Sequence, residues 1–337
     1  MSGSTIVVIG ASAGGLDALT RLAAQLPGDF PSPIFIVHHM AADTTGAALL
    51  QGIHKSGNLV CTEARDGEEF EGGHIYLAPA DHHLLLIRGK MLVTKGAREN
   101  RSRPGIDPLF RSAAVAYRSK VVGVLLTGYL DDGTAGMTAI HRCGGVCVVQ
   151  DPTDAAYPDM PQNALNRVKI DHTVPLAEMG ALLVRLLRRR TVKDRPVPND
   201  IAIEAKIAER VLSDLPSVEA LGDQVPFNCP GCGGVLWEVE KGNSLRYRCH
   251  TGHSFSAPVL LAEQTAKIEE TLWVALRMFE ERRNLLTTMS DRTNRAFSPS
   301  AADRAKDSEV HIGRIRSMLT SSDKATASVV DKRRTVS

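Results

Sequence analysis

A serine stands in a run of small residues, GASAGG over residues 10–15, near the start of the chain. The run follows the apolar segment Ile6–Ile9 and precedes the amphipathic stretch Leu16–Leu26, so it joins a predicted strand to a predicted helix. It matches the G-x-S-x-G turn, with Ser12 as the serine that such a turn exposes at the end of a strand. Small neighbours avoid clashes in so sharp a turn, and the amides at a helix N-terminus suit a developing oxyanion. The pattern therefore predicts a nucleophilic serine.

Two other interpretations of this turn compete. A dinucleotide-binding loop needs G-x-G-x-x-G, but Ser12 stands where the second glycine would let a pyrophosphate approach. No acidic residue closes a second strand about 20 residues further on, as that fold requires. The remaining alternative is a plain tight turn in which Ser12 caps the helix. The motif alone leaves this alternative open.

A serine nucleophile needs a base and a carboxylate that orients the base. The predicted strand over residues 34–37 runs into His38 and His39, and a later one over 122–127 runs towards Asp131 and Asp132. Because the carboxyl ends of parallel strands meet at one edge of a sheet, we expect these side chains near the serine. The order serine, histidine, aspartate differs from that of the α/β-hydrolases, although the chemistry would be the same.

The predicted strands and helices alternate from residue 5 to about residue 186. This alternation, with nearly all-apolar strands, predicts an α/β fold with a doubly wound, mostly parallel sheet. An antiparallel insertion is expected where Arg88-Gly89-Lys90 joins two short strands as a hairpin. The predicted strands cover residues 5–9, 33–38, 58–63, 74–78, 83–87, 91–94, 121–127, 145–150 and 172–174.

Composition excludes several classes of protein. The net charge of +2 over 337 residues gives no reason to expect binding to nucleic acid. The N-terminus has no basic region typical of a signal peptide, and the longest apolar run, Val121–Leu126, is too short to span a bilayer. We therefore expect a cytoplasmic protein with no membrane insertion.

Together these blocks resemble the catalytic domain of the chemotaxis protein-glutamate methylesterases (CheB-type) over residues 4–188. The resemblance rests on the serine turn, His39-Met40, Leu126-Thr127-Gly128 followed by Asp132-Gly133, Pro104–Phe110 with Asp107, and Met160-Pro161. It implies Ser12 as nucleophile, His39 rather than His38 as general base, and Asp132 rather than Asp131 as the orienting carboxylate. It also gives the backbone amide of Ala13 and one near Tyr129 as oxyanion candidates, although the family often has methionine at the position of Tyr129.

The implied reaction is hydrolysis of glutamyl γ-methyl esters on the cytoplasmic helices of a methylated chemoreceptor or similar signalling protein, without a catalytic cofactor. The same acyl-enzyme would allow deamidation of glutamine. The alternatives are a non-catalytic signalling scaffold and a serine esterase acting on another ester. Only four residues precede the first predicted strand, so we expect a stand-alone form without the N-terminal receiver domain that often regulates the family.

Four arginines near the Pro104–Phe110 block could dock acidic receptor helices, and an exposed solvated face is the other interpretation. They are Arg98, Arg101, Arg103 and Arg111.

A cysteine-rich segment, residues 227–257, predicts a second site. Cys229-Pro230-Gly231-Cys232 is followed by a predicted hairpin and then by Cys249, His250 and His253. This spacing is typical of a structural zinc site in a zinc-ribbon-like module. We expect Cys229, Cys232, Cys249 and His253 as ligands, with His250 as the alternative fourth ligand and a reduced, metal-free hairpin as the alternative to a zinc site. We also expect metal removal to leave the catalytic domain folded and active.

The other segments are less informative. We expect a linker with weak helix over 189–226, a helical region over 258–320, and a disordered polar tail over 321–337. A methyltransferase or other regulatory partner is expected to bind through the C-terminal region. Seven-residue repeats predict a seam between the C-terminal helices. The seam residues are Leu261, Ile268, Ala275, Leu272, Phe279 and Leu286, with Val310, Ile312, Ile315 and Leu319 on a second helix.

Overall fold

The computed structural model describes residues 5–188, 195–210, 214–240, 245–292 and 298–334. The chain divides into two compact units, residues 1–260 and 261–337. Among the described helices, none combines the length and the apolar character that crossing a membrane requires.

The first unit is built on a seven-stranded sheet in the order β3-β4-β2-β1-β7-β8-β9. Every neighbouring pair in this sheet is parallel. The strands are β1 (Ile6–Ala11), β2 (Ile34–His38), β3 (Val60–Glu63), β4 (His74–Leu77), β7 (Val121–Leu125), β8 (Val146–Gln150) and β9 (His172–Val174). The antiparallel insertion is the separate hairpin of β5 (His83–Ile87) and β6 (Lys90–Thr94). The predicted fold class is confirmed, with all nine predicted strands present.

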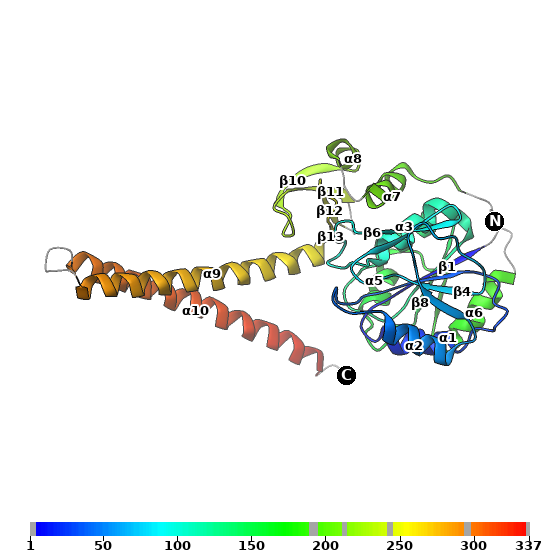
Figure 1. Ribbon diagram of the computed structural model, residues 1–337, viewed down its shortest axis with the longest axis horizontal. Helices are drawn as coiled ribbons and strands as arrows, with labels where there is room; N and C mark the ends of the chain where they lie inside the picture. The colour runs from blue at the N-terminus through cyan, green and yellow to red at the C-terminus, as the bar shows by residue number, and fades with distance from the viewer. Residues whose placement is uncertain (1–4, 189–194, 211–213, 241–244, 293–297, 335–337) are drawn as a thin grey trace. The chain divides into compact units, whose positions relative to one another are not determined.

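Helices cover both faces of this sheet, which explains why its strands are apolar throughout (Figure 1). Val7 and Ile9 of β1 pack on the face covered by α1 (Gly15–Ala23), α2 (Ala47–Ser56) and α6 (Leu176–Arg188). Ile6 and Val8 pack on the opposite face. That face carries α3 (Ile106–Tyr117), the 3₁₀ turn Arg118–Lys120, α4 (Thr134–Arg142) and α5 (Asp159–Arg167).

The cysteine-rich segment forms an antiparallel sheet of four strands, where the sequence predicted only a hairpin. The expected hairpin is present as β11 (Val235–Glu240) and β12 (Arg246–Cys249). It gains β10 (Asp223–Asn228) on one side and β13 (Ser254–Ser256) on the other. We call residues 223–256 the Cys/His module. It begins before residue 227 because Val225 pairs with Leu236 of the apolar strand β11.

The segment predicted as a linker with weak helix is partly built into the fold. It contains α7 (Asn199–Arg210) and α8 (Leu215–Glu219), while residues 189–194 and 211–213 lie outside the described part. Ile201 of α7 packs into the hydrophobic core on one face of the central sheet, and Ile207 packs with Trp237 of the Cys/His module. The segment therefore serves as a packing layer rather than a free linker.

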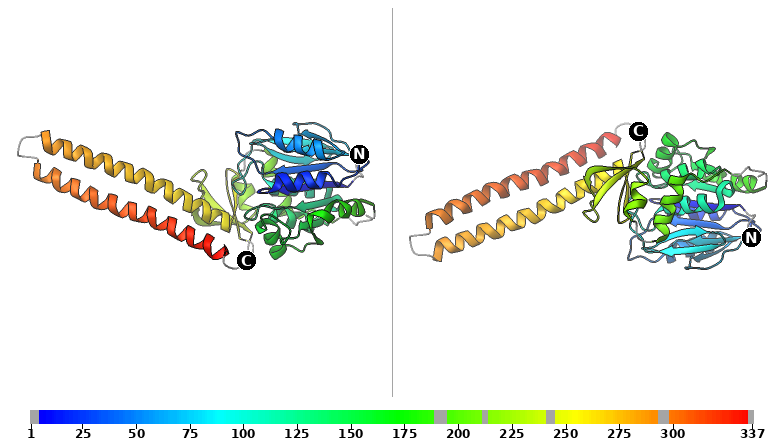
Figure 2. Two further views of the ribbon diagram at one scale, coloured as in Figure 1. Left: turned by 90° about the horizontal axis from the view of Figure 1, so that it is seen from below. Right: turned by 90° about the horizontal axis from the view of Figure 1, so that it is seen from above.

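The second unit contains most of α9 (Ala257–Arg292) and all of α10 (Ser298–Arg334), which run antiparallel side by side (Figure 2). The packed seam is shorter than predicted, because it is centred on Leu276, Ile312, Ile315 and Leu319. The predicted seam residues Leu261, Ile268 and Val310 are 66%, 61% and 52% exposed.

The structure also differs from the predicted disordered tail, since α10 continues to Arg334 and only residues 335–337 lie outside the described part. The segment 321–334 contains no proline or glycine. A helix that has been nucleated by packing extends through such a sequence at little cost.

Leu16 and Leu19 of α1 provide a matched test of the packing. Leu19 is 1% exposed in the core, whereas Leu16, three residues earlier in the predicted amphipathic stretch, is 46% exposed. Leu19→Ala should lower the free energy of unfolding by about 2–5 kcal/mol, because it removes buried methyl groups and leaves a cavity. Leu16→Ala should lower it by less than about 1 kcal/mol. Denaturant unfolding of both variants measures this, and equal losses would contradict the described packing of α1.

Candidate active site

Three neighbouring strands bring the predicted catalytic residues to one edge of the sheet. Ser12 follows β1, His39 follows β2, and Asp132 lies in the loop after β7. The sheet order places β1 between β2 and β7, so the chain turns in opposite directions on either side of it. The crevice at such a switch point, outside the carboxyl ends of the strands, is where open α/β sheets bind their ligands.

The turn that carries Ser12 depends on close backbone approach. Gly14 has φ of 74°, a left-handed conformation that suits glycine. A Cβ on Gly128 would lie 2.8 Å from the Cβ of Ser12, so the loop after β7 can approach the serine only with glycine there. The Ser12 N–H donates to the carbonyl of Thr127 at 3.0 Å, which ties the two loops together. No side chain caps α1, so the capping-serine interpretation is wrong.

Ser12, His39 and Asp132 form a continuous hydrogen-bonded relay. The Ser12 hydroxyl lies 3.1 Å from His39 Nδ1, and His39 Nε2 lies 2.7 Å from Asp132 Oδ2. With an ionised Asp132, Nε2 carries the proton that it donates to the carboxylate, which leaves Nδ1 free to accept the serine proton. The geometry is that of a nucleophile, a general base and an orienting carboxylate.

His38 points its Nε2 at the carbonyl of Ser12 instead, at 3.1 Å, and makes no contact with the hydroxyl. Burial, and then the neighbouring His39, lower the pKa of His38, while the hydrogen bond to Ser12 opposes this shift. The structure thus separates the two histidines that the sequence pattern alone left equivalent.

The Asp132 carboxylate is 2% exposed and surrounded by donors. The amides at the start of α3 supply two of them, Ile106 N–H at 2.8 Å and Asp107 N–H at 3.3 Å, and Gly133 N–H lies at 3.0 Å. The Asn100 side chain donates at 3.2 Å. Burial alone would raise the pKa of Asp132, but His39, the Ile106 amide and Asn100 lower it to about 2. Asp132 is therefore ionised near neutral pH.

The two neighbouring aspartates have structural contacts. Burial, and then the charge of Asp132, raise the pKa of Asp107 well above its usual value, and its carboxyl accepts from Gly136 N–H at 2.6 Å. Asp131 binds Arg167 at 2.7 Å and the Ser256 hydroxyl at 2.7 Å. The His39 ring bonds to Asp132, whereas Asp131 bonds to Arg167 and Ser256, in agreement with the prediction that Asp132 and not Asp131 orients the histidine.

The two oxyanion candidates lie on the loops that surround Ser12. Within the described part of the chain, the backbone N–H groups of Ala13 and Tyr129 have no hydrogen-bond acceptor, so both are available to a ligand. The ring of Tyr129 is 55% exposed and packs against Tyr157, with 4.6 Å between ring centroids.

The arginine cluster does not form one docking surface. Arg111 is buried and pairs with Glu99 at 2.7 Å and with Glu204 at 2.9 Å. Arg103 pairs with Asp81 at 2.6 Å. Only Arg98 and Arg101 of the four are exposed. The other two, Arg103 and Arg111, form ion pairs within the fold.

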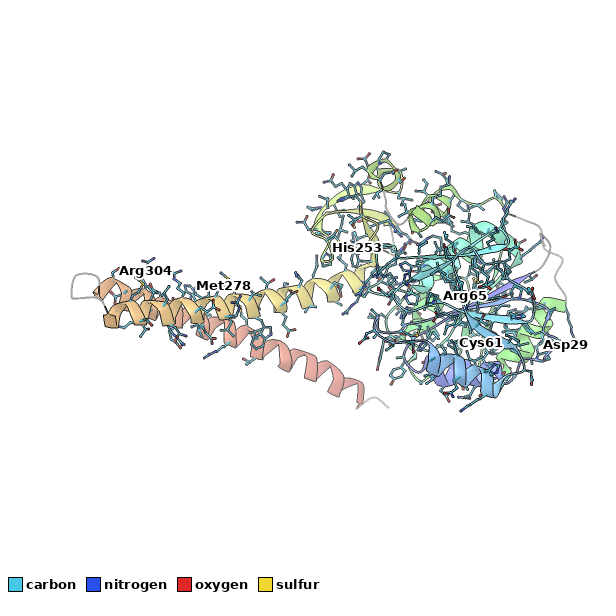
Figure 3. All side chains as sticks on the ribbon, in the orientation of Figure 1. Asp29, Cys61, Arg65, His253, Met278 and Arg304 are labelled. Atoms are coloured by element: carbon cyan, nitrogen blue, oxygen red, sulfur yellow. The ribbon has the colours of Figure 1, made fainter. Side chains whose placement is uncertain are left out.

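The four predicted metal ligands meet in the Cys/His module, with their ligand atoms all within 4.8 Å of one another. The Cys232 and Cys249 sulfurs are 3.8 Å apart, and Cys249 Sγ lies 3.5 Å from His253 Nδ1. A tetrahedral site with Zn–S bonds of about 2.3 Å separates two sulfurs by about 3.8 Å, so the donor set fits zinc. His253 lies in the turn between β12 and β13, at the place labelled in Figure 3. His250 is not in the ligand cluster and faces Gly234.

Sequence reasoning missed the residues that link the Cys/His module to the catalytic loops. Asn100 contacts Asp132, and Ser256 contacts Asp131, across separations of 32 and 125 residues. No local pattern marks either residue, because a polar residue in a predicted loop is ordinarily solvated. The ion pairs of five charged residues were also missed, because no sequence pattern shows which charges pair across different elements. These residues are Glu99, Arg111, Glu204, Arg246 and Arg248.

Comparison with known proteins places the catalytic core in a family. The sequence model of the CheB methylesterase family matches residues 7–183. A putative protein-glutamate methylesterase/protein-glutamine glutaminase of Leptospira interrogans is 39% identical over 181 residues, which cover 53% of this chain and 93% of that protein. A Thermotoga maritima protein-glutamate methylesterase/protein-glutamine glutaminase is 34% identical over 186 residues, covering 54% of each chain. The crystal structure of the Thermotoga maritima CheB methylesterase catalytic domain superposes with a TM-score of 0.53 at 34% identity, over 55% of this chain and 99% of that one.

The geometry predicts the reactivity of the serine. A fluorophosphonate, which phosphonylates activated serines, should label wild-type protein once, at Ser12, because His39 removes the hydroxyl proton. Ser12→Ala should abolish labelling, and His39→Ala should slow it by at least about 100-fold. His38→Ala should retain most of the wild-type rate, because His38 does not contact the hydroxyl. Intact-protein mass spectrometry follows the reaction, and equal losses in the two histidine variants would contradict the assignment of the base.

Proposed function

Because the chain belongs to the CheB methylesterase family, we propose that Ser12, His39 and Asp132 hydrolyse glutamyl γ-methyl esters on cytoplasmic helices of chemoreceptor-like proteins. The observation that carries this proposal is the unbroken relay from the Ser12 hydroxyl through His39 to Asp132. A non-catalytic scaffold would have no need for such a relay. The family and its relatives support the ester as the substrate class.

The reaction begins when the Ser12 oxygen attacks the ester carbonyl and its proton moves to His39 Nδ1. The tetrahedral intermediate then collapses, and the protonated Nδ1 returns the proton to the leaving methoxide, which departs as methanol. Water attacks the resulting acyl-enzyme with His39 again as base, releasing the glutamate carboxylate and Ser12. A glutamine side chain would give the same acyl-enzyme with loss of ammonia.

Asp132 acts on this reaction through His39. Its carboxylate accepts the Nε2 proton, holds the imidazole with Nδ1 towards Ser12, and stabilises the imidazolium that forms during attack. The amides of Ala13 and Tyr129 would donate hydrogen bonds to the oxyanion, which stabilises the negative charge of the tetrahedral intermediate. Tyr129 and Tyr157 would then lie at the substrate-facing edge.

We also propose that Cys229, Cys232, Cys249 and His253 hold one structural zinc ion. Three thiolates and one imidazole form a closed set with no open position for substrate, which is typical of a structural site. Zinc bound here contributes folding free energy to a small module that has few apolar residues of its own.

The proposed activity predicts methanol release from methylated receptor fragments by the purified chain. Ser12→Ala should reduce the release to background, because no acyl-enzyme can form, while its thermal unfolding should match that of the wild type. Gas chromatography of the methanol and mass spectrometry of the receptor peptide provide two readouts. Labelling of Ser12 by the fluorophosphonate without methanol release would favour a serine esterase acting on another ester.

The proposed zinc site predicts about one zinc ion per chain in protein purified without chelators. Trp237 is 6% exposed and packs in the Cys/His module, whereas Trp273 is 55% exposed, so Trp273→Phe leaves one informative fluorophore. Chelation should shift the emission of Trp237 to longer wavelength as the module loosens, and added zinc should reverse the shift. Loss of zinc in His250→Ala but not in His253→Ala would contradict the choice of fourth ligand, and an absence of stoichiometric metal would contradict the site.

A further inference from the structure

The last strand of the Cys/His module lies against the loop that contacts the catalytic aspartate. We propose that β13 positions Asp132 through Asn100, which makes the metal-binding module a working part of the active site. This inference rests on the proposed catalytic role of Asp132. Asn100 and Ser256 are positioning residues in this scheme, since neither touches the serine or the histidine.

Asn100 makes the central contacts. Its backbone N–H donates to the carbonyl of Ser254 at 2.9 Å, and its side-chain oxygen accepts from Ser256 N–H at 3.0 Å. The second bond fixes which end of the amide faces the module. The amide nitrogen therefore faces the catalytic domain, where it donates to Asp132 Oδ1 at 3.2 Å and Asp107 Oδ2 at 3.0 Å.

Ser256 makes a second, independent contact. Its hydroxyl donates to Asp131 Oδ1 at 2.7 Å, one residue before Asp132 in the same loop. Arg167 of α5 binds the other oxygen of Asp131 at 2.7 Å. The module and α5 thus hold the aspartate loop from two sides.

The loop that bears Asn100 needs such support. Asn100 and Arg101 have φ of 46° and 70°, a left-handed conformation that is unfavourable for two consecutive residues other than glycine. Asparagine tolerates this conformation better than most residues, and its contacts with β13 are made in it. Without the hydrogen bonds to β13, this unfavourable backbone conformation would not be stabilised, and the Asn100 amide would not be held towards Asp132.

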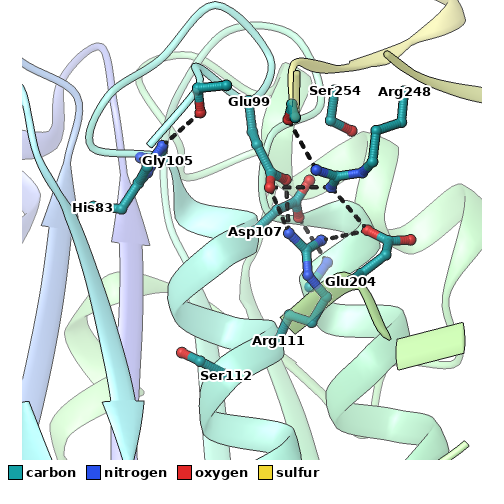
Figure 4. Close-up of polar contacts among 12 residues, drawn as sticks. His83, Glu99, Gly105, Asp107, Arg111, Ser112, Glu204, Arg248 and Ser254 are labelled. Atoms are coloured by element: carbon teal, nitrogen blue, oxygen red, sulfur yellow. Dashed lines mark hydrogen bonds and ion pairs between the residues drawn. The ribbon is translucent and has the colours of Figure 1, made fainter. Parts of the chain in front are cut away.

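A buried group of charges anchors the module beside this loop (Figure 4). Glu99, which precedes Asn100, pairs with Arg111 of α3 at 2.7 Å and with Arg248 of β12 at 3.0 Å. Glu204 of α7 pairs with the same two arginines, at 2.9 Å and 3.0 Å. Because Arg248 is fully buried, removing its acidic partners would leave an uncompensated buried charge. The loop and the module are therefore held as one body.

The metal ligands lie at the turn that sets the position of β13. Cys249 N–H donates to the carbonyl of His253 at 3.0 Å, which closes the turn between β12 and β13. In the register of the two strands, Arg248 pairs with Ser254, and Arg248 also donates to the carbonyl of Gly252 at 2.9 Å. A metal bound by Cys249 and His253 fixes this turn, and with it Ser254 and Ser256. The proposal therefore differs from the sequence-based expectation that metal removal leaves the catalytic domain active.

Substitution of Asn100 tests the link to Asp132. Asn100→Ala should lower kcat by roughly 10-fold, the effect of losing one hydrogen bond to a charged group, with KM changed less than about 2-fold. Asn100→Gly removes the same amide but suits the left-handed backbone, so it separates this effect from strain. Asn166→Ala, at an exposed asparagine of α5, is the control and should match the wild type. Ser256→Ala should lower kcat, and Ser256→Thr, which keeps the hydroxyl, should restore part of it.

Metal removal tests the link to the module. Chelation should slow fluorophosphonate labelling of Ser12 in the wild type by roughly the same factor as Asn100→Gly, and zinc should restore the rate. In Asn100→Gly, chelation should slow labelling little further. Both changes break the same link between the metal and Asp132, so their effects on the labelling rate are not additive. Hydrogen exchange gives a readout independent of turnover. The amides of Asn100 and Ser256 should exchange faster in the chelated protein, while that of Val8, in the central sheet, should not change.

The results of these experiments would support or contradict the proposed role of β13 and Asn100. Wild-type labelling and kcat in Asn100→Gly, or full additivity of this variant with chelation, would overturn it. Unchanged exchange at Asn100 after complete metal loss would overturn the role of the metal. Absence of methanol release from every protein, with labelling that still depends on Asn100 and zinc, would support the inference while contradicting only the proposed ester substrate.

Discussion

Burial of the Asp132 carboxylate is the constraint on which the site depends. A buried charge is costly unless hydrogen bonds replace its water, so every element around Asp132 must present a donor. His39 comes from the end of β2, the Ile106 and Asp107 amides from the first turn of α3, and Asn100 from the loop before it. The first turn of a helix offers amides without intrahelical partners, which explains why α3 begins at this carboxylate.

The same constraint accounts for the orientation of His39, the proposed general base. Because Asp132 holds the Nε2 proton of His39, Nδ1 faces Ser12. His38, one residue earlier on β2, alternates to the other side of the strand and reaches only the carbonyl of Ser12. Adjacent histidines thus have different environments, and the difference arises from strand geometry together with the position of one carboxylate.

Features that depend on short stretches of sequence could be predicted without the structure. Ser12, His39 and the strands that carry them follow from apolar runs, small residues and strand ends, and the four metal ligands follow from cysteine and histidine spacing. The contacts of Asn100 with Ser256 and of Glu99 with Arg248 join residues 156 and 149 positions apart, and no periodicity reports such pairing. Leu16 shows another limit of prediction from sequence. Helical spacing identifies the apolar residues of a helix, but it does not show that Leu16 is exposed. The helix beyond residue 320 was missed because a polar composition was taken to mean disorder.

The long sequence separation between Asn100 and β13 has a consequence for how the protein is made. During synthesis the central sheet can form once residues up to about 174 have emerged, since all its strands lie before that point. The aspartate loop receives its last partners only when Ser254 and Ser256 have been translated, and the proposed metal would close the turn before them. Closing so large a loop comes late in folding. If Asp132 and the metal have the roles proposed above, a nascent or prematurely terminated chain carries a folded sheet with an incomplete relay, and both translation and metal supply determine when Ser12 becomes reactive.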